Sequence, residues 1–365
     1  MAALRVLADD LTGALDGAAR FVSVAGPGLM PYVPTFWKPP RALDGPAAVD
    51  TGTRELAAAD ARTTADRLAC LLDDAEPAFR KIDSLLRGHV AVEIAATRRD
   101  FDHIIIAPAF PFQGRLTRSG RQLVREPNGW RDVGADLCAQ LKVHGDTVAL
   151  CRPGDAAPAG TSLWDAETDA DLQAVAAAGR TLPGRVLWCG SGGLAGALAG
   201  GHPAPAPALP PPILALIGSD HPASIAQLSA AWAYVHRIAR GDAEEAAPIA
   251  RRLARGSVAA AVVAPPGADR LMARHHIAAV FAALLTFLDC PGTLFVAGGE
   301  TLRAVCDCLG AERLDVDGEM IPGVPASVMR GGRWDRLRVV SKSGAFGDAG
   351  LLLRLLRPPL EGGPL

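Results

Sequence analysis

The sequence predicts two α/β domains, each with a mainly parallel β-sheet covered by helices, joined by a proline-rich connector. The chain has 365 residues, which is long for one ordinary domain and enough for two domains with separate cores. Short apolar runs rich in β-branched residues alternate with longer stretches rich in Ala and Leu. The runs are continuously hydrophobic, as strands are when helices cover both faces of their sheet. One segment made almost only of Pro, Ala and Gly separates the two halves.

The predicted strands form two groups, one in each half of the chain. In the first half they are Leu4–Ala8, Ala47–Asp50, Phe79–Ile82, His103–Ala107, Thr147–Cys151 and Val186–Cys189. In the second half they are Ile213–Ile217, Tyr234–Ala239, Val258–Val263, Thr293–Val296 and Leu337–Val340. Because helix-like stretches separate consecutive strands, the strands of each half are expected to lie parallel.

The connector is the segment 201–212, within the run GGHPAPAPALPPP. Proline lacks the backbone N–H that helices and sheets use, so we expect an extended, semi-rigid linker. It leaves an N-terminal domain of residues 1–200 and a C-terminal domain of residues 213–365, and both lengths are ordinary for domains.

Composition excludes several classes of protein. The formal net charge of -2 argues against a nucleic-acid binder and against a polybasic membrane-surface protein. No apolar run reaches the roughly 18 residues that a membrane span needs, and charges occur too early in MAALRVLADD for a secretory signal. A cytoplasmic protein is expected. The seven cysteines lack the spacing of a zinc site, so no metal is assigned to cysteine.

Lysine is rare in this chain. Of the 37 basic residues only four are lysines, namely Lys38, Lys81, Lys142 and Lys342. One interpretation is that a retained lysine marks a place where a compact ammonium is needed and a planar guanidinium does not fit. Chance retention is the other interpretation.

Polar residues follow four successive predicted strands of the first half. The carboxyl ends of neighbouring parallel strands converge on one crevice of an open α/β sheet, so these residues are expected to meet at one site. Arg and Lys side chains there would bind an acidic substrate, and carboxylates would accept hydrogen bonds from its hydroxyls. The candidate substrate-binding residues are Asp9, Asp10, Arg54, Lys81, Ile82, Asp83, Ser84, Arg87 and Arg115.

Structural roles are also open to some of these residues. Asp9 and Asp10 precede a helix expected to begin near Leu11, where Asp is a favourable N-cap. Ser84 or Asp83 could cap a helix in the same way. An aspartyl phosphatase of the Asp-x-Asp-x-Thr type is excluded, because Leu11 stands where the second acid would be.

Small residues follow the predicted strands of the second half. Glycine-rich turns at strand ends let backbone N–H groups approach a phosphate, and helix N-termini add a favourable dipole. We therefore expect a nucleotide there, with Lys342 as a point cation. The absence of Gly-x-x-x-x-Gly-Lys-Ser/Thr excludes a P-loop enzyme, and no Gly-x-Gly-x-x-Gly follows the first strand as in a Rossmann dehydrogenase. The candidate nucleotide-binding residues are Ser219, Gly298, Gly299, Glu300, Thr301, Lys342 and Gly344.

Six motifs, in this order, resemble those of the four-carbon acid sugar kinase family: ADDLTGALD, KIDSLLRGHVAVEI, APAFPFQGR, GSGGLAGALA, GGET and KSGAFGD. The resemblance covers nearly the whole chain. It implies an ATP-dependent kinase of threonate, erythronate or 3-oxo-tetronate type acids, with an N-terminal substrate domain and a C-terminal nucleotide domain. It implies substrate contacts from Asp10, Arg54 and the stretch from Lys81 to Ser84. It implies ATP contacts from Ser219, the loop from Gly298 to Thr301, and Gly344.

The expected reaction transfers the γ-phosphoryl group of ATP, bound with Mg²⁺, to a hydroxyl of the sugar acid. Asp10 or Asp83 is expected to accept the proton of that hydroxyl, and no residue is assigned as a Mg²⁺ ligand. The alternative is a catalytically inactive nucleotide-binding or sugar-acid-binding regulator of the same fold, because residues 241–267 look shorter than in the family. The sequence leaves open which acid is used and whether the chain forms a homodimer.

Overall fold

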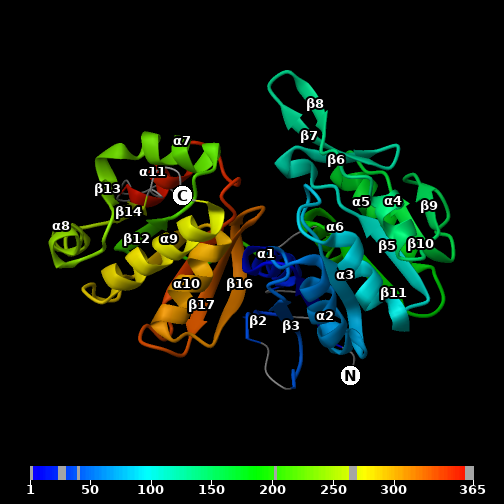
Figure 1. Cartoon of the computed structure of the whole chain (residues 1–365), viewed down its shortest axis with the longest axis horizontal. Helices are drawn as coiled ribbons and strands as arrows, with labels where there is room; N and C mark the ends of the chain where they lie inside the picture. The colour runs from blue at the N-terminus through cyan, green and yellow to red at the C-terminus, as the bar shows by residue number, and fades with distance from the viewer. Residues whose placement is uncertain (1–2, 24–29, 39–41, 201–203, 263–268, 358–365) are drawn as a thin grey trace. The chain divides into compact units, whose positions relative to one another are not determined.

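The structure, a computed structural model, describes residues 3–23, 30–38, 42–200, 204–262 and 269–357 (Figure 1). The chain forms two compact units, Met1–Ala204 and Pro205–Leu365, called here the first and the second unit. The division falls within the proline-rich segment, of which residues 201–203 lie outside the described residues.

A parallel sheet forms the centre of the first unit, with the strand order β2-β3-β1-β4-β11-β5-β10-β9. Every neighbouring pair in this order is parallel. The strands are β1 (Ala3–Ala8), β2 (Val33–Phe36), β3 (Ala47–Asp50), β4 (Ala75–Lys81), β5 (His103–Ala107), β9 (Val148–Cys151), β10 (Gly160–Trp164) and β11 (Val186–Gly190). Strands β2 and β10 were absent from the sequence prediction.

Helices cover both faces of this sheet. They are α1 (Leu11–Phe21), α2 (Ala58–Leu68), α3 (Val90–Thr97), α4 (Leu137–Val143), α5 (Asp169–Arg180) and α6 (Gly192–Leu198). On one face, Leu7 and Ile106 belong to the same buried cluster as Ile94 of α3 and Leu141 of α4. On the other face, a Cβ on Gly17 of α1 would lie 3.0 Å from Val6. Successive strand residues point to opposite faces, so the continuous apolar runs serve two helix layers.

A separate antiparallel sheet of three strands also belongs to the first unit. It consists of β6 (Arg115–Arg118), β7 (Arg121–Glu126) and β8 (Gly129–Asp132). The connection between β6 and β7 is a tight turn with positive φ at Ser119 (51°) and Gly120 (72°). The sequence prediction missed this sheet, because its strands are rich in Arg and partly exposed and therefore lack a continuous apolar run.

The sheet of the second unit has the order β13-β14-β12-β15-β18-β17-β16. Its strands are β12 (Ile213–Ile217), β13 (Val235–Ile238), β14 (Val258–Val262), β15 (Thr293–Ala297), β16 (Arg313–Ile321), β17 (Val324–Arg330) and β18 (Arg338–Lys342). The first five strands in this order pair in parallel, whereas β18, β17 and β16 pair antiparallel. The sequence prediction missed β16 and β17. The predicted end of β14, Val263, lies outside the described residues.

The helices of the second unit are α7 (Pro222–Ala230), α8 (Ala243–Leu253), α9 (Arg270–Leu285), α10 (Gly299–Leu309) and α11 (Leu351–Leu356). Helices α7 and α11 contact each other, and α11 contributes four leucines to a buried cluster with Phe295 and Val340. Helices α9 and α10 form a second contacting pair. No helix in the described part of the chain is long and apolar enough to cross a membrane.

Candidate active site

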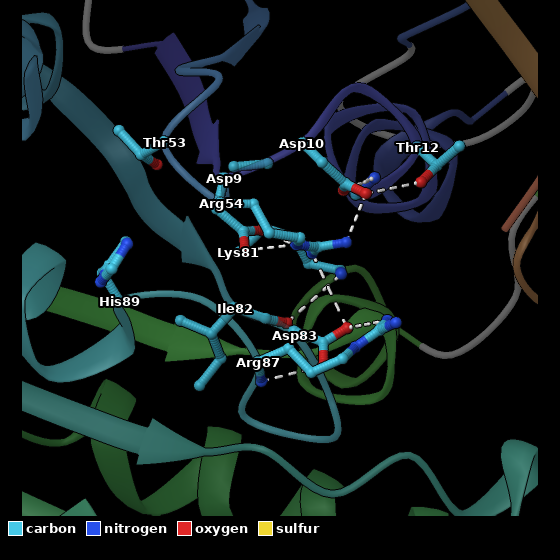
Figure 2. Close-up of polar contacts among 12 residues, drawn as sticks. Asp9, Asp10, Thr12, Thr53, Arg54, Lys81, Ile82, Asp83, Arg87 and His89 are labelled. Carbon is cyan, nitrogen blue, oxygen red and sulfur yellow. Dashed lines mark hydrogen bonds and ion pairs between the residues drawn. The ribbon is translucent and has the colours of Figure 1, made fainter. Parts of the chain in front are cut away.

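The ends of three neighbouring strands bring the charged residues of the first unit together. Strand β1 lies between β3 and β4, and all three are parallel. Asp9 and Asp10 follow β1, Arg54 lies in the loop after β3, and Lys81 is the last residue of β4. The predicted convergence of these side chains is present in the structure, and Figure 2 shows Asp10, Arg54 and Asp83 pointing toward one another.

Arg54 is the centre of this cluster. Its guanidinium binds Asp9 in a bidentate manner, with Nε to Oδ2 and Nη2 to Oδ1 both at 2.7 Å. Its Nη1 donates to Asp10 Oδ2, and its Nη2 lies 3.7 Å from Asp83 Oδ1. One planar cation therefore contacts three carboxylates, an arrangement that the forked donors of Arg allow and that the single ammonium of Lys cannot reproduce.

Asp10 has two roles in the structure. Its Oδ1 accepts a hydrogen bond from Gly13 N at 2.7 Å, which caps α1. Its Oδ2 accepts from Thr12 Oγ1 at 3.0 Å and from Arg54. The capping role considered from the sequence is therefore real, and it fixes the orientation of the carboxylate that contacts Arg54.

Asp83 is held by its own turn. Its Oδ2 accepts hydrogen bonds from Leu85 N at 3.0 Å, from Arg87 N at 3.2 Å and from Arg87 Nε at 2.9 Å. Arg87 Nη2 adds a contact of 2.7 Å to Oδ1. The structural alternative, a helix capped by Ser84 or Asp83, is wrong, since α3 begins only at Val90 and its N-cap is His89.

The turn after β4 uses unusual backbone conformations. Leu86 has a φ of 57° and Gly88 a φ of 80°. A bulky side chain rarely adopts a positive φ, and such residues cluster at functional sites. A Cβ on Gly88 would lie 3.1 Å from Asp9 Oδ2 and 3.5 Å from Arg54 Cα. The turn therefore packs directly against the Asp9–Arg54 pair, and glycine permits that approach.

Lys81 pairs with a residue that the candidate list did not include. Its Nζ lies 3.4 Å from Asp16 Oδ2 and 3.4 Å from Ile82 O. Asp16 lies on α1 and is buried. The feature that could have identified Asp16 is a carboxylate within an Ala- and Gly-rich helix, which is buried along almost its whole length. A charge buried in such a helix requires a partner.

The electrostatics of Asp9 and Asp83 differ. Burial, together with the nearby charges of Asp10 and Glu93, raises the pKa of Asp9 to about 6 against the opposing charge of Arg54. Burial also acts on Asp83, but the hydrogen bonds of Arg87 and the charges of Arg54 and Arg87 outweigh it and hold the pKa of Asp83 well below its usual range. Asp83 is therefore a firmly ionised anchor, whereas Asp9 titrates close to neutral pH.

The remaining candidates of the first unit lie around this cluster. The side chain of Ile82 packs in the apolar core and not in the charged cluster. Ser84 is buried, and its carbonyl accepts a hydrogen bond from Gln122 Nε2 at 2.7 Å. Burial lowers the pKa of Arg115, and the charge of Asp83 partly opposes this, which places Arg115 within electrostatic reach of the cluster.

A second set of candidates converges in the second unit, where β15 lies between β12 and β18. Gly298 has a φ of 109°, and a Cβ there would lie 3.3 Å from Thr301 Oγ1. A Cβ on Gly344 would lie only 2.2 Å from Ser219 Oγ. The cradle therefore consists of four closely packed residues, Ser219, Gly298, Thr301 and Gly344. Because two of them are glycines, the backbone there is not covered by a side chain. Such a cradle of amides and hydroxyls fits phosphate groups.

Three other candidates of the second unit stand apart from this cradle or border it. Gly299 is the first residue of α10. Glu300 is exposed and forms an ion pair with Arg274 Nη2 at 2.5 Å. Lys342 is fully buried, and its Nζ donates to Ser224 Oγ, Ser343 O and Gly344 O at 3.1, 3.2 and 3.0 Å. Three neutral oxygens of the protein therefore already accept hydrogen bonds from the ammonium that we expected to act as a point cation.

Within the described residues, no side chains are grouped as metal ligands. The described ranges contain no group of three or more His, Cys, Asp and Glu residues placed to hold a metal ion. The cysteines of the described ranges are free and form no disulfide.

Two family models match the chain. One is described as a sugar-binding N-terminal domain and matches residues 4–148, and the other as a nucleotide-binding C-terminal domain and matches residues 214–352. Among solved structures, a putative tRNA synthase from Salmonella typhimurium is 20% identical with a TM-score of 0.73, covering 98% of this chain and 99% of that one. A Haemophilus influenzae protein is 19% identical with a TM-score of 0.67, covering 96% and 99%. These two structures share the fold.

Curated relatives cover nearly the same length. A D-threonate kinase from Bordetella bronchiseptica is 30% identical, over 96% of this chain and 95% of the relative. A D-threonate kinase from Cupriavidus necator is 32% identical, over 95% of each. A 3-oxo-tetronate kinase from Methylobacterium radiotolerans is 30% identical, over 75% of this chain and 78% of the relative. The chain therefore belongs to the four-carbon acid sugar kinase family, as its sequence motifs predicted.

Proposed function

We propose that this chain is an ATP-dependent kinase that phosphorylates a hydroxyl of a four-carbon sugar acid of the threonate, erythronate or 3-oxo-tetronate class. The observation that supports this best is the Arg54 guanidinium held against Asp9, Asp10 and Asp83. The relatives named D-threonate kinase and 3-oxo-tetronate kinase support the substrate class.

The cluster offers the groups that a polyhydroxy acid needs. A hydroxyl both donates and accepts hydrogen bonds, so a guanidinium beside a carboxylate can serve both functions at once. The substrate carboxylate needs cations, which Lys81 and Arg87 supply at the edge of the cluster. Arg87 is half exposed, with 51% of its side chain accessible, and can therefore reach a ligand.

We assign proton acceptance to Asp10 rather than Asp83. The carboxylate of Asp83 already accepts four hydrogen bonds from the turn and from Arg87, and its depressed pKa makes it a weak base. Asp10 is more accessible, with 17% of its side chain exposed against 9% for Asp83. Asp83 then acts by holding Arg87 and Arg54 in place.

The nucleotide belongs in the second unit in this proposal. Ser219, Gly298, Thr301 and Gly344 form the cradle for its phosphates. The Mg²⁺ ion would arrive with ATP and neutralise phosphate charge, since phosphoryl transfer depends mainly on positioning and electrostatic stabilisation.

The direct test is ADP release, measured by a coupled assay with ATP, Mg²⁺ and a panel of acids. The panel contains D- and L-threonate, D- and L-erythronate and their 3-oxo derivatives. We expect turnover with at least one of them. Binding of ATP and of an acid without any ADP release would contradict the kinase and support the inactive regulator.

Two Asn variants test the roles of the carboxylates. Asp10→Asn keeps an oxygen that can cap α1 but removes the base, so kcat should fall by about 10²-fold or more with ATP binding intact. Asp83→Asn should instead raise the KM for the acid, because Arg87 and Arg54 lose their common partner. Equal kcat in wild type and Asp10→Asn would remove Asp10 as the base.

A further inference from the structure

Lys342 lies at the end of β18 and is buried completely, which is unusual for a lysine. An ammonium has three donors, and all three of the contacts recorded for its Nζ are neutral oxygens: Ser224 Oγ, Ser343 O and Gly344 O. Burial lowers the pKa of this lysine to about 8, so the ammonium depends on these acceptors to remain charged.

Side chains of α7 hold the loop after Lys342 by hydrogen bonds to the backbone carbonyl groups of that loop. Ser224 Oγ donates to Gly344 O at 2.9 Å. One turn further along α7, Gln227 Nε2 donates to the carbonyl oxygens of Phe346, Gly347 and Asp348 at 3.1, 3.1 and 3.0 Å. Lys342, Ser224 and Gln227 thus bind the loop 343–348 from the side on which α7 lies.

The direction of these carbonyls determines the direction of the amides. In a trans peptide the N–H of the next residue points opposite to the C=O. The Ser343 and Gly344 carbonyls face the lysine, so the N–H groups of Gly344 and Ala345 face away from it. In the described part of the chain, neither of these two amides donates to a protein acceptor.

The same residue also reaches the second loop of the cradle. The backbone carbonyl of Lys342 accepts a hydrogen bond from Gly298 N at 3.0 Å. Gly344 packs against Ser219, where a Cβ would lie 2.2 Å from Oγ. Lys342 therefore lies behind both of the glycine loops that form the cradle.

We propose that Lys342 is a positioning residue, which holds the Ser343 and Gly344 carbonyls inward so that the amides of Gly344 and Ala345 are presented to the phosphates of the nucleotide. This proposal rests on the proposed function of the second unit. It differs from the role expected from the sequence, because the ammonium acts through the loop and does not touch the phosphate. Three converging acceptors suit a compact ammonium, and a planar guanidinium does not satisfy them.

The test compares Lys342→Met and Lys342→Arg with Lys142→Met, a matched control at an exposed lysine of the first unit. We expect both Lys342 variants to raise the KM and the calorimetric Kd for ATP about tenfold or more. The KM for the acid should stay within about twofold, and the control should match wild type. Ser224→Ala removes one of the two donors to Gly344 O and should have a smaller effect in the same direction.

Hydrogen exchange gives a readout without nucleotide. Phe346 N donates to Ser343 O at 3.1 Å, so exchange of the Phe346 amide should be faster in Lys342→Met than in wild type. If wild type does not bind ATP, the proposed function fails, and this exchange still decides whether Lys342 holds the loop.

Three results would overturn the proposal. One is a fall in kcat with unchanged ATP affinity, which would mean that Lys342 acts on the transferred group. Another is an equal loss of affinity for ATP and for the acid, which would mean a general structural role. The third result concerns the case in which Lys342→Met does not fold. If Ser224→Ala then folds and has the ATP affinity and the Phe346 amide exchange rate of wild type, the proposal is also overturned.

Discussion

The two candidate sites of this chain are built from different chemical groups. In the first unit, one guanidinium contacts three carboxylates. In the second unit, Gly298 and Gly344 lie where a Cβ would come close to Thr301 or Ser219. The cation of that site, Lys342, is buried beneath the loop 343–348. Arranged charges can distinguish one hydroxy acid from another, whereas closely approaching amides suit any phosphate. We infer that selectivity for the acid resides in the first unit.

This difference predicts that substitutions should separate the two ligands. A change in the charged cluster should affect the acid and leave ATP binding intact. A change of shape in the glycine cradle should do the reverse.

The largest effect is expected for Arg54→Met. The change removes the shared cation of Asp9, Asp10 and Asp83, and kcat/KM for the acid should fall roughly a hundredfold to a thousandfold. ATP affinity, measured by calorimetry, should not change. Arg54→Lys keeps the charge without the bidentate geometry and should fall between wild type and Arg54→Met. A parallel loss of ATP affinity in a folded Arg54→Met variant would contradict the separation.

A smaller effect of the opposite kind is expected for Gly344→Ala. The new Cβ would lie 2.2 Å from Ser219 Oγ, so the cradle must shift, and ATP affinity should fall by about 10²-fold. The KM for the acid should remain as in wild type. Gly256→Ala is the matched control in the same unit, because a Cβ there meets nothing within 4 Å. Wild-type ATP affinity in Gly344→Ala would show that the loop is not part of the nucleotide site.

The smallest effect concerns pH. The charged groups that act on Asp9 are Arg54, Asp10 and Glu93, and the pKa of Asp9 is about 6. As the pH falls through this value Asp9 takes up a proton and Arg54 loses a charged partner. The KM for the acid should therefore rise below about pH 6, by at most about tenfold per pH unit. Asp9→Asn should lack this step, and a step of the same size in that variant would assign it to another group.

Strands were predicted where the sequence is continuously apolar. The bounds of β3, β5 and β12 agree with the prediction to the residue, because strands buried on both faces are apolar along most of their length. The pair β16 and β17 was missed, although Pro322 and Gly323 between them are a turn signal, because polar residues interrupt both strands.

The sequence predicted which charged residues lie at the site, but not which of them form ion pairs with one another. Asp9, Asp10 and Arg54 were identified because each follows a predicted strand. The contact of Lys81 with Asp16 could not be identified in this way, because it depends on β4 lying directly beside β1 and on the orientation of α1. Ile82 was listed as a site residue because it lies within the KIDSLLRGHVAVEI motif, but its side chain packs in the apolar core.

The two α/β halves and the residues at their strand ends could be predicted from the amino-acid sequence, because strand-forming patterns and turn residues are local properties of the chain. Which of these residues contact one another became apparent only in the folded chain. Lys342, for example, is buried, and its partner Ser224 lies 118 residues away in the chain. The direction of a side chain depends on what packs against it, and distant segments supply that packing.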